Sequence, residues 1–344
     1  MPRVSVVIPN YQGEKYIEPC LNSLLMQGFT DIIIRVIDNG SKDDGIIILK
    51  EYLEKRGYLE QREEDGWHCY LAEKLPQIEL LLLTENTGFC HAVNEGIRRS
   101  SEEYLFLLNN DTTLEVSCIS ELCSFMDRHA DAFSAGAKML AMQNKSLADD
   151  CGDYYNAFGY AFAAGKMKDS MRYQKERRVF SACAGAAIYR KEVFDRIGLF
   201  DENHFAYLED VDIGYRGRIM GYHNYFTPSA VVYHAGSAVS GSRHNAFKVT
   251  LSSRNSVYLA YKNQPLLQWI LNLPLRLLGY FVKFLFFTRK GLGKTYLKGI
   301  GKGVAFCFSK EAGKHKVRFR FKNLSCYIKI QFELWLNIIR MFTI

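Results

Sequence analysis

The stretch IELLLLTENTGFCHAVNEGIRRSSEEYLFLLNND, residues 78–111, decides the fold. Its two ends, 78–86 and 103–111, carry short aliphatic runs that predict buried strands. The segment between them, 88–100, predicts a helix. A strand, a helix and a second strand indicate a parallel α/β sheet, whose functional side chains lie in the loops after the strand ends.

The same alternation extends toward the N-terminus. VSVVIP at 4–9 and IIIRVID at 32–38 are rich in β-branched residues and predict two further strands. Apolar residues recur at helical spacing in 14–27, and the helix expected over 43–57 begins with acids, as a helix N-terminus does. The polar residues of 54–76 predict a surface insertion. The sequence therefore predicts a largely parallel central sheet flanked by helices.

The composition is that of an ordinary globular protein. The 344 residues are 48% hydrophobic and 24% charged, with 26 Gly and 7 Pro, which excludes collagen-like, low-complexity and wholly disordered chains. The nine cysteines form no CxxC pair, so we expect reduced thiols in the cytosol rather than a zinc ribbon or a disulfide scaffold. The first residues, MPRVSVVIPNY, lack the layout of a signal peptide.

The charge is unevenly distributed along the chain. Residues 1–253 hold 27 Lys and Arg against 35 Asp and Glu, a net charge of −8. Residues 254–344 hold 17 Lys and Arg against two acids, Glu311 and Glu333, a net charge of +15. So basic a segment requires an anionic partner or surface. We therefore expect a catalytic domain of residues 1–253 and a basic amphipathic C-terminal region of residues 254–344.

An apolar stretch, LLQWILNLPLRLLGYFVKFLFF at 266–287, lies within this basic region. A membrane-spanning helix needs about 20 apolar residues with few charges, whereas this stretch contains Pro274, Arg276 and Lys283. Apolar and aromatic residues beside cations favour a helix that lies in the interface of an anionic membrane. Two alternatives stay open: a buried helix of a C-terminal subdomain with a solvated basic face, and a true membrane span.

Three polar residues fall just after predicted strand ends: Asp38, Asn86 and Asp111. A nucleotide site at this edge must handle phosphate charge, yet the GxGxxG loop is absent after the first strand. The P-loop-like TRKGLGKT at 288–295 has Thr288 in place of its first glycine. A divalent cation held by the carboxylate of Asp111 is then the expected substitute.

A second group of acids consists of Glu209, Asp210 and Asp212. If a helix begins near 209, Asp210 and Asp212 point to different faces, because residues two apart on a helix diverge. One of them can face a substrate while the other pairs with Arg216 or Arg218. A carboxylate beside other acids binds a proton more readily, which suits a general base. The alternative is an acidic helix N-terminus without catalytic function.

Six segments follow one another in a specific order. They are VSVVIPNYQGEKYI (4–17), VIDNGSKDDG (36–45), TENTGFCHAVNEGI (84–97), LFLLNNDT (105–112), CAGAAIYRKEVFDRIGLFDENHFAYLEDVDIGYRGR (183–218) and VVYHAGSA (231–238). This order resembles the inverting glycosyltransferases of family 2, which have the GT-A fold, and especially their rhamnosyltransferase-like branch. The resemblance extends over residues 4–238 of the chain.

The resemblance implies a nucleotide-sugar donor that lies across the first half of the sheet. The residues implied to bind it are Pro9, Asn10, Tyr11, Asp38, Asn39, Asn86, Gly88, Phe89, Asn94, Asn109 and Asn110, and Ser41 is implied to shape the loop of Asp38. Turn or helix capping remains the alternative role of Asp38, Asn86 and Asn94. The family's D-x-D motif corresponds to Asn109, Asn110 and Asp111, so an uncharged Asn replaces its first Asp.

The resemblance also implies the catalytic and metal-binding residues. The family's E-D pair corresponds to Glu209 and Asp210, with Asp210 as the general base. His234 corresponds to a position that contacts the metal or the diphosphate, although a histidine after a strand-like run is also typical of a protein core. The implied cofactor is Mn²⁺ or Mg²⁺, held chiefly by Asp111.

The implied reaction moves a sugar, with rhamnose as the first candidate, from a nucleoside-diphosphate sugar to a hydroxyl of a lipid-linked glycan in cell-surface polysaccharide synthesis. We expect the enzyme on the cytoplasmic face of a membrane, where residues 266–340 contact the anionic surface. No RNA-binding motif accompanies the basic segment 314–323, so we expect no nucleic-acid partner. The alternatives are an inactive membrane-associated nucleotide-sugar-binding protein, and a metal-dependent phosphohydrolase or nucleotidyltransferase.

Overall fold

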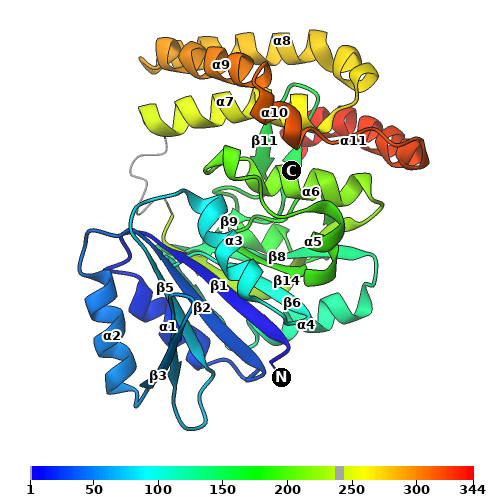
Figure 1. The fold of residues 1–344 in the computed structure, drawn as a ribbon. Helices are drawn as coiled ribbons and strands as arrows, with labels where there is room; N and C mark the ends of the chain where they lie inside the picture. Colours follow the sequence, from blue (N-terminus) through cyan, green and yellow to red (C-terminus); the bar gives the residue numbers. More distant parts are fainter. Residues whose placement is uncertain (1, 237–243) are drawn as a thin grey trace.

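The computed structural model describes residues 2–236 and 244–344 (Figure 1). One large sheet with helices on both faces fills the lower part of the view, and the C-terminal helices lie together above it. The predicted α/β fold with a C-terminal helical appendage is therefore confirmed. The main strands are β1 (Val4–Asn10), β2 (Ile32–Asn39), β3 (Leu59–Glu64), β4 (Trp67–Leu71), β5 (Ile78–Leu83), β6 (Tyr104–Leu108), β8 (Ala132–Ala141), β12 (Arg177–Val179), β13 (Ala186–Arg190) and β14 (His223–His234).

The strands of the sheet follow the order β12-β14-β8-β13-β6-β1-β2-β5-β4-β3. The four central strands β6, β1, β2 and β5 are parallel, and Val4 lies opposite Ile32 on one side and Tyr104 on the other. β1, β2 and β6 are buried on both faces, which explains their unbroken apolar sequences. Because parallel strands end at one edge, Asn10, Asn39 and the loop after Leu108 come together there.

Helices cover both faces of this parallel core. The side chains of Val4, Val6 and Ile8 pack in one hydrophobic cluster, and Val7 and Ile37 pack in a second cluster on the opposite face. Helices α1 (Ile17–Leu25), α2 (Gly45–Lys55) and α4 (Cys118–Arg128) contribute to the first cluster, and α3 (Phe89–Arg99) and α5 (Lys191–Ile197) contribute to the second. The sheet thus forms the middle of three layers.

The polar segment 54–76 forms part of the sheet, whereas the sequence predicted a surface insertion. Its strands β3 and β4 make an antiparallel hairpin, and β4 pairs with β5. Trp67 and Tyr70 are buried against the core. The acidic residues of the hairpin are exposed, as predicted, but its two strands and their buried residues were missed because these charges mask them in the sequence.

The second half of the sheet carries the acidic residues. β7 (Thr112–Leu114) pairs with β14, and β9 (Asn144–Asp150) pairs with β8. A separate ribbon consists of β10 (Asp153–Tyr155) and β11 (Ala161–Ala163). Helix α6 (Glu209–Ile219) begins at the predicted residue.

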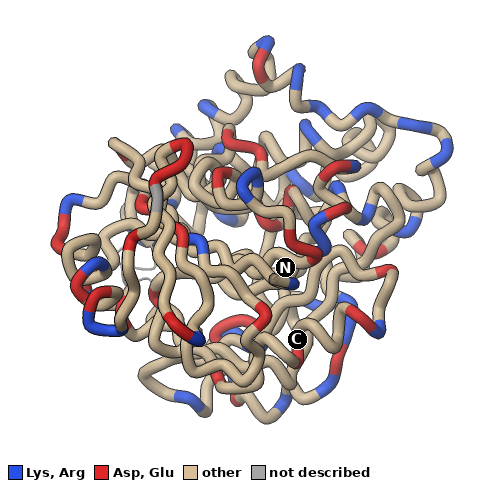
Figure 2. The backbone as a smooth tube through the Cα atoms, turned by 60° about the horizontal axis from the view of Figure 1, so that its bottom comes forward, with Lys and Arg blue, Asp and Glu red and all other residues tan. Residues whose placement is uncertain are grey.

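The C-terminal region consists of α7 (Ala246–Asn263), α8 (Leu266–Arg289), α9 (Gly293–Cys307), α10 (Lys310–His315) and α11 (Leu324–Thr343). The predicted helix over 266–287 is present as α8 and continues through Pro274. Helix α7 crosses the predicted boundary between residues 253 and 254, so the division into two domains stays a prediction. Figure 2 shows the charged residues along the backbone, with Lys and Arg in blue.

Candidate active site

A cavity of about 520 Å³ lies at the strand-end edge of the parallel core. We call it the strand-end pocket. Six of its lining residues are predicted donor-binding residues, and others come from the loop after α5 and from α7. The lining is Pro9, Asn10, Tyr11, Asn39, Asn86, Phe89, Phe205, Ala206, Asn245 and Phe247.

Hydrogen bonds between buried side chains join the ends of three strands at this pocket. Asn10 donates from Nδ2 to Oδ1 of Asp38 at 2.8 Å, and Asn110 donates to Oδ1 of Asn10 at 2.7 Å. Asp38 also accepts from the backbone N–H of Ser41 at 3.0 Å. The structure thus places Asp38 and Asn110 behind Asn10, where they fix its amide.

A second set of bonds fixes the loop that precedes α3. Asn39 accepts from the backbone N–H of Thr87 at 2.9 Å and donates to the carbonyl of Gly88 at 3.1 Å. Gly88 has φ +93°, and a Cβ there would lie 2.6 Å from the ring of Phe205. Only glycine therefore allows Phe205 to close on this loop.

A cavity of about 360 Å³ shares Phe89 with the strand-end pocket. We call it the acidic pocket, because Asp153, Glu209 and Asp210 line it. Burial raises the pKa of Asp210 to about 6, although hydrogen bonds with the Val211 amide and with Asp153 oppose this. Burial and the charge of Asp210 raise the pKa of Glu209 to about 8. Of the two, Asp210 is therefore the carboxyl that ionises more readily, and Glu209 the one that keeps its proton to higher pH.

Two buried acids near the acidic pocket, Asp150 and Asp153, were not among the residues predicted from the sequence. Oxygens of Asp150 and Asp153 and the Sγ of Cys183 all lie within 4.8 Å of one another. Burial and the charges of Asp150 and Asp210 raise the pKa of Asp153 well above its usual range. The available signal was ADDCGDYY at 148–155, with three Asp in five residues.

Asp212 faces away from the acidic pocket, which confirms that Asp210 and Asp212 diverge. It accepts from Arg216 Nε at 3.0 Å, from Lys262 Nζ at 2.8 Å and from Asn263 Nδ2 at 2.7 Å. Burial opposes the ionisation of Asp212, but Lys262 and Arg216 hold its pKa well below the usual range. Its role is to tie α6 to α7.

The loop before α6 is strained. Phe205, Tyr207 and Leu208 have φ of +63°, +68° and +70°, values that non-glycine residues rarely adopt. Asn255 of α7 donates from Nδ2 to the carbonyls of His204, Ala206 and Tyr207, each at 2.9 Å. The C-terminal region thus holds the loop that presents Glu209 and Asp210. Sequence reasoning missed Asn255, since only the fold brings it to this loop.

The predicted metal residues are neighbours. The pairing of β7 with β14 aligns Thr112 with His234, and His234 Nε2 lies 3.3 Å from Oδ1 of Asp111. His234 Nδ1 lies 2.8 Å from Oδ2 of Asp149. Burial lowers the pKa of His234, but Asp111 and Asp149 outweigh it and raise the pKa to about 9. Without a cation, His234 therefore carries a proton shared with these carboxylates. Asp111 and Nε2 could hold Mn²⁺ or Mg²⁺ once the cation displaces that proton, with Asp149 behind the ring.

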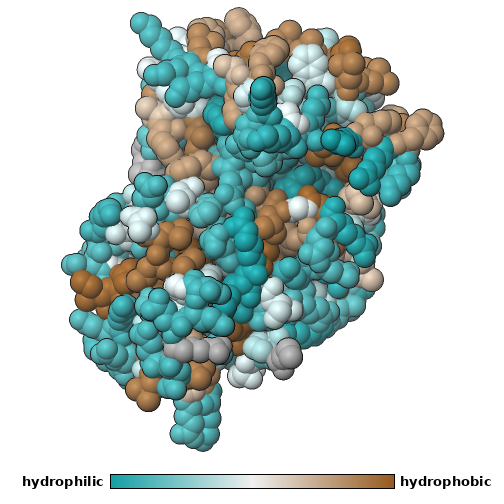
Figure 3. Space-filling model, in the orientation of Figure 1, coloured by the Kyte–Doolittle hydropathy of each residue, from teal (hydrophilic) through white to brown (hydrophobic). Residues whose placement is uncertain are grey.

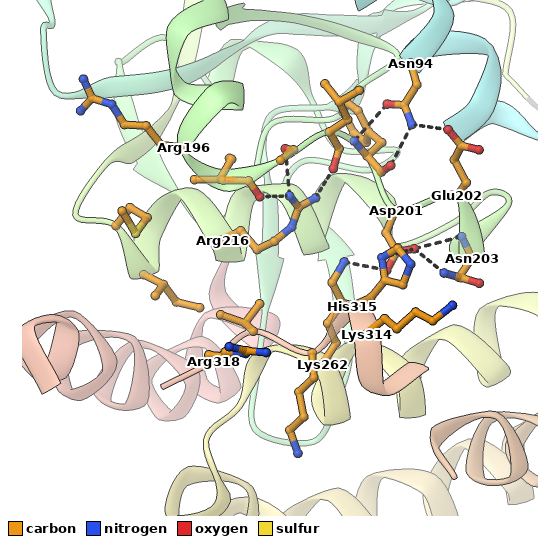
Figure 4. A pocket seen from close by; sticks show the side chains of 18 of the residues that line it. Asn94, Arg196, Asp201, Glu202, Asn203, Arg216, Lys262, Lys314, His315 and Arg318 are labelled. Atoms are coloured by element: carbon orange, nitrogen blue, oxygen red, sulfur yellow. Dashed lines mark hydrogen bonds and ion pairs between the residues drawn. The ribbon is translucent and has the colours of Figure 1, made fainter. Parts of the chain in front are cut away.

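Asn94 lies outside both pockets. It donates to the carbonyl of Phe200 and to Oε1 of Glu202, both at 2.9 Å (Figure 4). It lines a cavity of about 900 Å³ between the C-terminal end of α6 and the segment after α10. The acids of this cavity are already paired, Asp201 with Lys262 at 2.7 Å and Glu311 with Lys314 at 2.8 Å. The structure thus shows Asn94 as a tie between α3 and the loop after α5, and its predicted nucleotide contact stays a prediction.

Comparison with known proteins identifies the family. The family model of glycosyl transferase family 2 matches residues 5–198. The chain belongs to this family. It is 26% identical over 223 residues to the uncharacterized glycosyltransferase RP339 of Rickettsia prowazekii, and the match covers 62% of this chain and 58% of that protein. The match thus spans little more than half of that relative's length.

Two further comparisons concern a named enzyme and a solved structure. N-acetylglucosaminyl-diphospho-decaprenol L-rhamnosyltransferase of Mycobacterium tuberculosis is 23% identical over 283 residues, 73% of this chain and 84% of that protein. The crystal structure of GalNAc-T7 with UDP, GalNAc and Mn²⁺ superposes with a TM-score of 0.57 at 15% identity, over 75% of this chain and 47% of that one. The structural likeness shows the shared GT-A fold.

In this family 2 glycosyltransferase, strand β9 carries one acid toward each of the two predicted centres. Asp111 contacts His234, and His234 contacts Asp149. Asp150, the next residue in β9, interacts with Asp153, which is hydrogen-bonded to Asp210. The residues of the predicted metal site and of the predicted base thus belong to two acidic groups that are joined through neighbouring positions of β9, and Asn109 lines the acidic pocket beside Asp210.

Proposed function

We propose that this glycosyltransferase inverts the anomeric carbon of a nucleoside-diphosphate sugar as it transfers the sugar to a hydroxyl of a lipid-linked glycan. The supporting observation is that the strand-end pocket and the acidic pocket meet at Phe89. A donor in the first and an acceptor in the second would place the reacting atoms near Asp210.

The reaction is a single in-line displacement. The acceptor oxygen forms a bond to the anomeric carbon, the bond from that carbon to the diphosphate oxygen breaks, and the nucleoside diphosphate leaves. Asp210 takes the proton of the acceptor hydroxyl, since it ionises more readily than Glu209 in the same pocket. Glu209 keeps its proton and therefore adds no second negative charge.

The residues that would hold the cation are Asp111 and His234. Asp149 orients the imidazole through Nδ1 and leaves Nε2 directed at Asp111. When bound, Mn²⁺ or Mg²⁺ neutralises charge on the diphosphate leaving group. The GalNAc-T7 structure, which contains Mn²⁺, supports this choice of ion.

The proposed donor sugar is rhamnose and the proposed acceptor is a diphosphate-linked lipid glycan. The Mycobacterium tuberculosis relative, named as a rhamnosyltransferase acting on a decaprenol diphosphate, supports both. A lipid-linked acceptor would be met at the cytoplasmic face of a membrane. Helix α8 is long and apolar enough to cross a membrane, and only 17% of its most apolar window is buried, which supports contact between residues 266–340 and lipid.

One alternative keeps the binding sites without the activity. Asn109, at the first position of the D-x-D motif, lines the acidic pocket and lacks the usual charge there. An inactive nucleotide-sugar-binding protein would bind a donor without turning it over.

A two-step experiment tests the proposed function. A thermal-shift panel of nucleoside-diphosphate sugars with and without Mn²⁺ identifies the donor, and release of nucleoside diphosphate is then measured with and without a lipid-linked acceptor. We expect metal-dependent stabilisation by one donor and release that requires the acceptor. Donor binding without release would support the inactive alternative, and acceptor-independent hydrolysis would indicate a phosphohydrolase.

A further inference from the structure

The polarity of helix α8 is the reverse of that of a surface helix in water. Its buried side chains are mainly polar, Gln268, Asn272 and Arg276, whereas its exposed ones are aliphatic and aromatic. Gln268 accepts from the hydroxyl of Tyr215 at 2.8 Å, and Arg276 is hydrogen-bonded to Gln264. A helix at a water-facing surface has the opposite arrangement. The exposed side of α8 is therefore suited to surroundings less polar than water.

Helix α11 is hydrogen-bonded to α8 and also exposes large apolar side chains. Gln331 and Asn272 exchange hydrogen bonds of 2.8 and 2.9 Å, which join the two helices through their inner sides. Asn337 donates to the carbonyl of Tyr155 at 2.8 Å. Phe332 and Phe342 on the outer side are 63% and 77% exposed. Both helices thus bury amides and expose large apolar side chains, although α11 also buries the apolar Tyr327, Ile330 and Leu334.

The outward side chains of the two helices form one surface, which we call the apolar face. It consists of Leu266, Leu267, Ile270, Leu271, Leu277, Leu278, Phe281, Val282, Leu285 and Phe286 of α8, and Ile328, Phe332, Trp335, Leu336, Ile339 and Phe342 of α11. Figure 3 shows hydrophobic residues in brown along the top and the right end of the molecule, where these helices lie. Exposed apolar surface of this extent marks an interaction site.

Unpaired cations lie next to the apolar face. Both acids of the C-terminal region are already in ion pairs, Glu311 with Lys314 and Glu333 with Arg218. Among the described residues, no ion pair to an acid is found for Arg289, Lys290, Lys294, Lys298 or Lys302 of α8 and α9. These charges match the headgroups of an anionic leaflet.

We propose that the apolar face inserts into the hydrocarbon layer of one anionic phospholipid leaflet, with α8 lying in the plane of the membrane rather than crossing it. Crossing would pull Gln268 and Asn272 away from their hydrogen-bond partners, and would expose them and the charge of Arg276 to hydrocarbon. In-plane insertion leaves these bonds intact and reaches about 5–10 Å into the lipid. This inference deepens the membrane location in the proposed function, but its test needs neither donor nor acceptor.

The three tryptophans allow a direct test. Trp269 lies in α8 and Trp335 on the apolar face, whereas Trp67 is buried in the sheet. Single-Trp variants, made by Trp→Phe substitution, are mixed with phosphatidylcholine–phosphatidylglycerol vesicles that carry acyl-chain bromines. We expect quenching of Trp269 and Trp335 and none of Trp67. Equal fluorescence of all three with and without bromines overturns the proposal.

The orientation of α8 is tested by measuring how deep a tryptophan in this helix lies in the bilayer. Leu278→Trp places a single tryptophan in the middle of α8, in a background in which the other three are Phe. Bromines near the headgroup should quench it more than bromines near the methyl ends, because an in-plane helix stays shallow. Stronger quenching by the deep bromines would show that α8 crosses the membrane and overturns the in-plane arrangement.

A charge on the apolar face should weaken vesicle binding. Phe281→Asp is compared with Val116→Asp, since the two side chains are 57% and 59% exposed but Val116 lies on the sheet-bearing part. We expect about tenfold or more loss of affinity for Phe281→Asp only. A stable dimer without lipid that ignores vesicles would show instead that a second copy covers the face. Transfer to a water-soluble acceptor is assayed separately, so failure here leaves the proposed reaction unaffected.

Discussion

The carboxyl groups of Asp153 and Asp210 are hydrogen-bonded to each other in the acidic pocket. Asp153 is the buried partner and holds its proton well above the usual pKa, so it is the donor and Asp210 the acceptor. Two acids so close cannot both ionise at neutral pH. The arrangement leaves one defined carboxylate, that of Asp210, facing the space next to Phe89.

Replacing the base should abolish most of the activity. Asp210→Asn keeps the shape of the side chain but cannot accept the proton of the acceptor hydroxyl. We expect kcat to fall by about 10²–10⁴-fold while donor binding, measured by thermal shift, stays within about twofold. Near-normal turnover of this variant would remove Asp210 from the role of base.

The decrease of kcat/KM at low pH should depend on both Asp153 and Asp210. Activity requires ionised Asp210, so kcat/KM should fall as the pH drops through about 6, the pKa to which burial raises this group. Asp153→Ala removes a donor that favours the ionised form, and we expect the acid limb to move to higher pH. Asp153→Asn keeps an N–H that can donate to Asp210, so its activity should decrease at about the same pH as that of the unchanged enzyme. An unmoved limb in the alanine variant would show that Asp153 acts on packing alone.

Much of the site follows from local sequence, and the rest depends on the tertiary fold. Strand ends identify Asp38, Asn86 and Asp111, because parallel strands finish at one edge of the sheet, and of these Asn86 lines the strand-end pocket. Asn10 and Asn39 followed from the family resemblance alone. Helical spacing separates Asp210 from Asp212. By contrast, Asp153 reaches Asp210 only through the placement of a short ribbon, which no periodicity in the sequence encodes.

For the C-terminal helices, too, the sequence predicted local character but not tertiary placement. The apolar character of α8 is evident in the sequence, but an apolar stripe does not say whether it faces protein or lipid. Its orientation depends on Asn272 and Gln331 meeting across two helices that are far apart in the chain. The hairpin over 59–71 was missed for a similar reason, since its charged outer side conceals the buried Trp67.

The carboxylate behind His234 should tune metal affinity. Asp149→Asn keeps the side-chain shape but weakens the hold on Nδ1, so we expect the Mn²⁺ concentration for half-maximal binding to rise by about 10–100-fold. Direct Mn²⁺ binding, followed by electron paramagnetic resonance, measures this without turnover. Asp169→Asn, at an exposed acid that caps a short turn, is the control and should not change it. Equal Mn²⁺ affinity in the two variants would contradict the role of Asp149.

The buried ion-pair network of α6 should dominate the stability of the interface with α7. Asp212→Asn leaves Arg216 without its carboxylate partner and Lys262 with Asp201 alone, and breaking such a buried pair costs about 3–5 kcal/mol. Urea unfolding at neutral pH measures the loss. Asp195→Asn, at an exposed residue with a long contact to Lys191, should change stability by less than about 0.5 kcal/mol. Because the pKa of Asp212 is lowered on folding, its contribution is present above the unfolded pKa of about 4 and declines below it.

The contact between Asn255 and the strained loop should matter for turnover more than for stability. Asn255→Ala removes the donor to the carbonyls of His204, Ala206 and Tyr207, so the loop that presents Asp210 relaxes from its positive-φ conformation. We expect a loss of about 10²-fold in kcat, the cost of misplacing a catalytic group by about 1 Å. Asn272→Ala is the matched control, because it also removes a buried amide of the C-terminal region but lies away from the loop. Similar melting temperatures with a large difference in kcat would support a positioning role for Asn255, and equal kcat values would show that the loop keeps its conformation without this amide.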